Sequence, residues 1–389
     1  MALSGVTFNR GEGGLGRPLA GEDHISGLVA YMTDGNLPTG FTTSTRVKLV
    51  YSIAEAEALG IAEGSANHSV IWYHIDEFFK MNPKGALYIG LYDSVSISYA
   101  VIETVQNFAN GKIRQIAVFD ETTFTAATLT TLQVSATALA VAHKPLNVLY
   151  AGDITGTADL TTLADLRALS NPNVSAVIGE DGSAAGNALA VAEGYSVTCI
   201  GAALGALSLA NVHENIGWLA KFNLVKGVEF DVPAFANLDL TSSYTDAQLS
   251  AIQALGYIFI MKYVGNTGTY FNDSPTATLI TSDYAYIENN RTIDKAIRGV
   301  YTFMLPNVNG PLTLNSSGQM SEATAAKFRN DGRRAIAQML IDGEVSAFDV
   351  LVDPTQDVLT TSKVVVTIQI VPIGVARQIE VNIGFTVSI

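Results

Sequence analysis

The chain has 389 residues, of which 48 % are apolar and only 15 % are charged, and its formal net charge is −14. This length predicts two or three domains with cores of their own. The charged share is well below the roughly 25 % of an average soluble protein, which favours a surface that faces other protein; a single, deeply buried polypeptide is the alternative. An acidic balance without clustered Lys or Arg argues against binding to nucleic acid.

The sequence shows no sign of export or membrane insertion. Cys199 is the single cysteine, so no intrachain disulfide can form, as is usual for a protein made in a reducing cytoplasm. The first residues, Met1–Gly5, lack the basic and apolar regions of a signal peptide. No apolar run reaches the roughly 18 residues that a membrane helix needs, so we expect no membrane partner.

Residues 1–27 are expected to form an N-terminal arm. A short, imperfect strand pattern is formed by Leu3, Val6 and Phe8. The glycine-rich stretch 11–16 fits the G-x-G-x-x-G spacing of a dinucleotide site, but such a site lies between a buried strand and a helix. Here Arg17 and Pro18 follow instead. We therefore predict a flexible tether and no cofactor.

Residues 28–285 alternate short apolar strands with helices, possibly as two subdomains, 28–221 and 222–285. The predicted strands are 47–51, 87–92, 113–119, 146–150, 174–178, 257–261 and 269–271. The predicted helices are 69–80, 97–109, 128–142, 158–169 and 246–255. Buried strands that alternate with helices are typical of a mostly parallel sheet with covered faces. We expect an outer, doubly wound-like α/β domain.

Residues 286–375 are expected to form a C-terminal α+β domain. Apolar residues at helical spacing define one helix, a serine cap and a terminal glycine define another, and an apolar run defines a strand. These elements are a helix from Ile293 to Met304, a helix capped by Ser321 that ends before Gly343, and a strand at 364–371.

Residues 376–389 form the clearest pattern, a C-terminal arm beyond a hinge at Pro372 and Gly374. Apolar and polar residues alternate strictly to the last residue, and the apolar positions are Ile379, Val381, Ile383, Phe385, Val387 and Ile389. In a strand these side chains share one face. Ordering the arm costs about as much as burying its side chains gains, so we expect it to fold against another subunit's sheet. The alternative is a last strand in the chain's own sheet.

Acidic residues follow several predicted strands, where α/β enzymes place their sites. They are Asp93, Asp120, Asp153, Glu180 and Asp181. A magnesium-dependent α/β hydrolase that uses Asp120 and Asp153 is therefore an alternative. However, Asp is also the usual residue for capping a following helix, the histidines form no paired ligand motif, and Cys199 has the pattern of a buried apolar residue. We expect no catalytic or metal-binding residues and no enzymatic activity.

Several stretches resemble the contractile tail sheath proteins of myoviruses, especially the compact sheaths of Mu-like phages. Related sheaths occur in R-type bacteriocins and other contractile injection systems. The similar stretches are 257–264, 268–273, 290–294 and 364–389, together with the small-residue helix Gly201–Ala206. The resemblance covers most of the chain and is best over 257–389.

The resemblance implies a structural subunit of a sheath in the virion tail, made in the host bacterial cytoplasm. Hexameric rings of this subunit would stack helically around an inner tail tube protein, with baseplate and tail terminator proteins at the ends, and the sheath would shorten when triggered. Both arms would add strands to neighbouring subunits: the N-terminal arm through Leu3–Phe8 and the C-terminal arm through Ile379–Ile389. Another virion component, such as a baseplate or capsid subunit, is a further alternative.

The C-terminal domain would face the tube, and the sequence suggests which residues could do so. Four basic residues on the helix after Ser321 are the candidates, and they are Lys327, Arg329, Arg333 and Arg334. They could meet an acidic tube surface. A solvated helix face is the alternative, because exposed charges contribute little by themselves.

Overall fold

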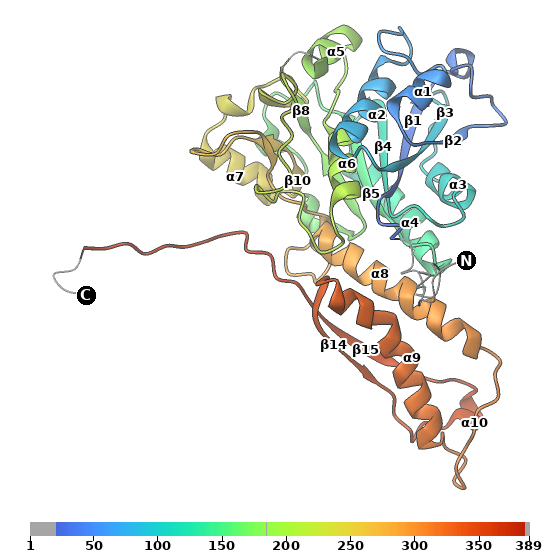
Figure 1. Cartoon of the computed structure of the whole chain (residues 1–389). Helices are drawn as coiled ribbons and strands as arrows, with labels where there is room; N and C mark the ends of the chain where they lie inside the picture. The colour runs from blue at the N-terminus through green and yellow to red at the C-terminus, as the bar shows by residue number, and fades with distance from the viewer. Residues whose placement is uncertain (1–20, 184, 386–389) are drawn as a thin grey trace, which may run out of the picture.

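The computed structural model describes residues 21–183 and 185–385, and its body is built on a seven-stranded sheet (Figure 1). The strand order is β10-β7-β5-β4-β1-β3-β2. All neighbours are parallel except β2 with β3. The strands are β1 (Ile25–Met32), β2 (Val47–Val50), β3 (Ala86–Asp93), β4 (Gln115–Thr123), β5 (Asn147–Asp153), β7 (Val174–Val177) and β10 (Tyr257–Ile258).

Alternation along the strands divides the core into two layers, one on each face of the sheet. In β1, Leu28 and Ala30 belong to one layer, and Val29 and Tyr31 belong to the other. The first layer includes residues of α2 (Ser69–Met81) and α6 (Ile200–Leu209), and the second includes residues of α3 (Val101–Phe108) and α4 (Ala126–Val141). The predicted mixed α/β class, with a mostly parallel sheet and covered faces, is confirmed.

Helix α6 packs unusually close to α2 because two of its residues are glycines. A Cβ atom on Gly201 would lie 2.3 Å from the backbone oxygen of His74, and one on Gly205 would lie 2.6 Å from that of Phe78. Neither collision could be relieved by rotating a side chain. The small-residue helix identified in the sequence is therefore a close helix–helix contact.

Two predicted elements differ from the structure. The segment 158–169 is not an α-helix but two short 3₁₀ turns, Leu160–Thr162 and Leu166–Ala168. The side chains of Asp159 and Asp165 accept hydrogen bonds from backbone N–H groups two residues ahead, which favours turns over a continuous helix. The predicted strand 257–261 is also divided at Phe259: β10 joins the main sheet, whereas β11 pairs with β12.

Smaller elements complete the body. Three two-stranded sheets pair β6 (Ser170–Asn171) with β13 (Ala277–Thr278), β8 (Gly179–Asp181) with β9 (Pro233–Phe235), and β11 (Ile260–Met261) with β12 (Tyr270–Phe271). The remaining helices of the body are α1 (Ile53–Ala58), α5 (Ala185–Glu193) and α7 (Asp246–Ala254).

A second, smaller unit projects from the body (Figure 1). Helix α8 runs from the body into this unit, where α9 packs against it and against the antiparallel pair β14 and β15. Its elements are α8 (Ile287–Met304), α9 (Glu322–Ile341), β14 (Val345–Leu351), α10 (Val358–Thr361) and β15 (Thr367–Pro372). Strands β1 and β14 were not predicted, and the last residues of the predicted N-terminal arm belong to β1. Within residues 21–183 and 185–385, no helix has both the length and the apolar character that crossing a membrane requires.

We expect the Gly205→Ala variant to be less stable than the wild type. Alanine is favoured over glycine in a helix by up to about 1 kcal/mol, but the collision with the Phe78 backbone should cost about 1–3 kcal/mol and outweigh it. Urea unfolding would measure the difference. Gly35→Ala is the control, because its added methyl group meets nothing within 4 Å. A Gly205→Ala variant as stable as the wild type would show that the two helices can separate without cost.

Candidate functional site

The described part of the C-terminal arm extends away from the subunit (Figure 1). The exposed fractions of Ile379, Val381 and Ile383 are 81 %, 68 % and 91 %, and Phe385 is fully exposed. From Gln378 to Phe385 the arm has neither a strand partner nor a hydrogen bond within the described residues. The described part is therefore not the last strand of the subunit's own sheet.

Other arm residues lie outside the described ranges. They are Val387 and Ile389 of the C-terminal arm, Leu3, Val6 and Phe8 of the N-terminal arm, and the glycine stretch 11–16. Their predicted roles stay predictions.

The antiparallel pair β14 and β15 is a second candidate assembly feature. Each strand has one edge without a strand partner among the described residues. One face packs on α9 and α8 through Val345, Phe348 and Ile370. Leu351 and Val371 are 47 % and 54 % exposed. Open edges of this kind are templates for further strands.

The four predicted tube-facing residues do not form one patch. Arg329 pairs with Glu322, and Arg333 pairs with Asp349 of β14 at 3.4 Å. Arg334 lies 5.4 Å above the ring of Phe303, and Lys327 is exposed without an ion pair among the described residues. By helical spacing Lys327 and Arg334 lie on one side of the buried stripe of α9, and Arg329 and Arg333 lie on the other.

The strand-end aspartates hold the turns that follow their strands. Asp120 accepts hydrogen bonds from the Tyr99 hydroxyl at 2.8 Å and from the Thr122 backbone N–H at 2.9 Å. Asp153 likewise accepts hydrogen bonds from the backbone N–H groups of Thr155 and Ser196. Asp181 accepts them from the backbone N–H groups of Ser183 and Phe230. These contacts are structural and do not bring Asp120 and Asp153 together in a three-carboxylate group.

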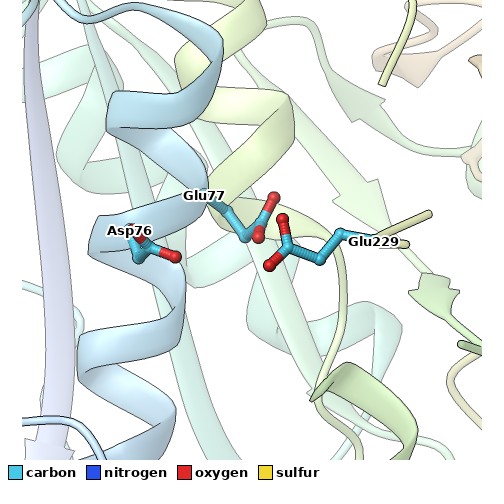
Figure 2. A group of neighbouring side chains, drawn as sticks. All are labelled: Asp76, Glu77 and Glu229. Atoms are coloured by element: carbon cyan, nitrogen blue, oxygen red, sulfur yellow. The ribbon is translucent and has the colours of Figure 1, made fainter. Parts of the chain in front are cut away.

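One group of three carboxylates within the described ranges could hold a cation. Figure 2 shows Glu77 of α2 and Glu229 of a later loop pointing toward one another, with Asp76 beside them. The Lys80 Nζ atom already lies 2.5, 3.3 and 2.6 Å from oxygens of Asp76, Glu77 and Glu229. We interpret the group as a cluster around Lys80 that ties the loop to α2, with its shortest ion pairs to Asp76 and Glu229.

Glu180 is the most unusual of the strand-end carboxylates. It is completely buried in β8, and neither of its carboxylate oxygens has a hydrogen-bond partner within the described residues. Burial, with a smaller contribution from the neighbouring charge of Asp181, raises the pKa of Glu180 to about 8. Its side chain is therefore mostly protonated at neutral pH. The sequence pattern located this residue but could not show that it is buried.

The sequence matches two family domains that together span almost the whole chain. They are the N-terminal domain of DUF2586 over residues 3–275 and the C-terminal domain of DUF2586 over residues 283–389. The chain belongs to the DUF2586 family. No curated protein sequence matches this DUF2586 chain significantly.

Solved structures share the fold of this DUF2586 protein. The contracted helical sheath of the anti-feeding prophage (AFP) aligns with a TM-score of 0.67 at 16 % identity and covers 100 % of both chains. A chain of the six-fold symmetrised AFP baseplate aligns at 0.63 with 15 % identity and covers 99 % of both. The contracted sheath complex of an extracellular contractile injection system, PVC, aligns at 0.62 with 12 % identity and covers 100 % of this chain and 98 % of that one. The predicted resemblance to contractile sheath proteins is confirmed for the fold.

We expect the free energy of unfolding to fall as pH rises from about 6.5 to 7.5, and Glu180→Gln to reduce that slope. The folded protein keeps the Glu180 proton up to about pH 8, whereas an unfolded chain releases it near 4.5. The unfolded state then binds fewer protons, so stability is lost with rising pH by about 1.4 kcal/mol per unit for each such group. Burial also raises the pKa of Glu77 to about 8, so Glu77 still contributes to the slope in the Glu180→Gln variant.

Urea unfolding at several pH values would measure these slopes. Glu63→Gln is the control, because that carboxylate is exposed. An unchanged slope in Glu180→Gln would show that Glu180 is ionised in the folded protein.

Proposed function

We propose that this chain is the structural subunit of a contractile tail sheath. It would polymerise helically around an inner tube by strand exchange and shorten to drive the tube through a target envelope. One observation carries the proposal: on a fold shared with sheath proteins, a segment of alternating apolar residues leaves the body exposed and without a strand partner in its described part. An exposed apolar surface of this kind marks an interaction site.

The exchange would be a β-augmentation between copies. Ile379, Val381, Ile383 and Phe385 would face a neighbour's core, while the arm backbone would pair with an open edge of its β14–β15 sheet. Each backbone hydrogen bond adds about 0.5–1.5 kcal/mol, and ordering the arm costs about 1–2 kcal/mol per residue. The net gain per arm is therefore small, but it recurs throughout the polymer. Donating and receiving surfaces differ, so the contact generates rings or open helices.

The fuller proposal follows the family pattern. The N-terminal arm, through Leu3, Val6 and Phe8, would add a second exchanged strand, and a doubly wound-like α/β domain would lie on the outside. Hexameric rings would surround an inner tail tube protein, with baseplate and tail terminator proteins at the ends of a virion tail. The match to a six-fold symmetrised AFP baseplate chain supports this symmetry. Contraction would draw on a metastable packing of subunits and require no catalysis.

We expect a chain truncated after Arg377 to remain folded and to form no tubes, because the donated strand is missing. Phe385→Asp should have nearly the same effect, since it places a charge on the buried face of the strand. Asn382→Asp is the matched control: it adds the same carboxylate on the opposite face and should assemble. Electron microscopy would show tubes or their absence, and circular dichroism would report folding.

Other outcomes of that experiment contradict the proposal. Normal tubes from the truncated chain would mean that assembly does not use the arm. Loss of folding on truncation would mean that the arm belongs to its own subunit's core. Discrete small oligomers of the full chain would favour another virion component or the hydrolase alternative.

We expect the Lys327→Glu/Arg334→Glu pair to weaken binding to the inner tube more than the Arg329→Glu/Arg333→Glu pair. The first two lack an ion pair within the described residues, whereas the other two already have carboxylate partners. Co-sedimentation of sheath and tube proteins would measure the difference, with Lys112→Glu on the body as control. Equal binding by all three variants would exclude α9 as a tube-facing surface.

A further inference from the structure

Arg377, at the start of the C-terminal arm, is held by the body of its own subunit. Its Nε atom lies 3.2 and 2.9 Å from the two carboxylate oxygens of Asp273, and its Nη2 atom donates to Glu288. The guanidinium carbon lies 3.3 Å from the ring centroid of Tyr286. The planar group is thus bound by two carboxylates and stacked on an aromatic ring, an arrangement that arginine can make and lysine cannot.

The pocket that receives Arg377 is held together by its own hydrogen bonds. The Asn215 amide donates to Asp273 at 2.5 Å and to Glu288 at 3.3 Å. The Ser274 backbone N–H donates to Asp273 at 2.8 Å, and the Ser274 hydroxyl donates to Glu288. The side chains of Asp273 and Glu288 are only 8 % and 2 % exposed. A cation stabilises two carboxylates that are buried side by side, and Arg377 supplies it.

The position of this contact along the chain indicates its role. Strand β15 ends at Pro372, and within the described residues Arg377 makes the last hydrogen bond between the chain and its own body. Residues 373–376 therefore form a short strap that is held at both ends, by β15 and by Arg377. Of the predicted hinge residues, Pro372 ends β15 and Gly374 lies inside this strap, so freedom to move begins at Gln378.

We propose that Asp273, Tyr286 and Glu288 form a guanidinium-binding site that anchors Arg377 and thereby sets the point from which the exchanged strand leaves the subunit. The inference rests on the proposed function, because an anchor matters only if the arm is donated. From a fixed point at Arg377, the chain to residue 389 can span at most about 40 Å. A receiving sheet must then lie within that distance of the site.

The test compares assembly of full-length variants. Arg377→Ala should raise the critical concentration for tube formation about tenfold, because the strap must be ordered anew for each exchange. Arg377→Lys, which keeps the charge but loses the forked contact, should give a smaller rise. Gln378→Ala, the adjacent exposed residue, should assemble like the wild type. Sedimentation would measure the critical concentration, and thermal unfolding of the unassembled subunit would show whether the fold is retained.

Each outcome either supports or overturns the proposed anchor. A longer tether alone would raise the critical concentration of Arg377→Ala by no more than about twofold. A rise of that size or less overturns the proposed anchor. If Arg377→Ala fails to fold, the paired variant Arg377→Gln/Glu288→Gln, which removes one positive and one negative charge together, is judged by the same thresholds. Tubes that form after truncation beyond Arg377 would instead refute the strand exchange in the proposed function, so the two failures are distinguishable.

Discussion

A buried network of charges where α8 meets the body holds the two parts of the molecule together. The Arg291 guanidinium, 3 % exposed, donates to the backbone oxygens of Ala210, Asn211 and Asp23. One turn further along, the Lys295 ammonium lies 2.8 Å from Asp23 and 2.5 Å from Glu344. Buried charges are stable only when they are paired and hydrogen-bonded. Helix α8 is therefore fixed in position, and with it the smaller unit and the Glu288 end of the arginine pocket.

Residues of this junction lie in the short stretches that resemble sheath proteins. Asp273 lies in the similar stretch 268–273 and forms half of the arginine pocket, while Arg291 lies in 290–294 and fastens α8. Asp294, in the same stretch, accepts a hydrogen bond from Asn147 at 3.3 Å, and burial raises the pKa of its carboxyl to about 6. These residues hold parts of the chain together that are far apart in sequence.

The structure combines a tightly packed body with an extended end that has no strand partner in its described part. A mostly parallel sheet covered on both faces and the glycine contacts between α2 and α6 leave the body few ways to deform. The described part of the arm, by contrast, makes no hydrogen bond to the described body beyond Arg377. In the proposed sheath, the bodies could shift as rigid units while exchanged strands keep them connected. Stiffness in one part and freedom in the other are both needed for a lattice that changes length without coming apart.

The sequence alone determined the features that depend on neighbouring residues. Helical spacing located α8, the Ser321 cap located the start of α9, and strict alternation identified the C-terminal arm. Alternating strands and helices also predicted the mostly parallel sheet, because a chain that must cover both faces of a sheet repeats that order.

Only the tertiary structure decided the features that depend on distant partners. It placed β1 inside the sheet, between β4 and β3, and split the segment 257–261 between two sheets, since pairing depends on strands elsewhere in the chain. It showed Glu180 without a hydrogen-bond partner among the described residues and Arg377 bound to Asp273, 104 residues away. In the sequence, Arg377 is simply a charged residue just before the alternating apolar residues of the C-terminal arm. Its role as an anchor arises because folding brings two buried carboxylates and a tyrosine ring to the place where the arm begins.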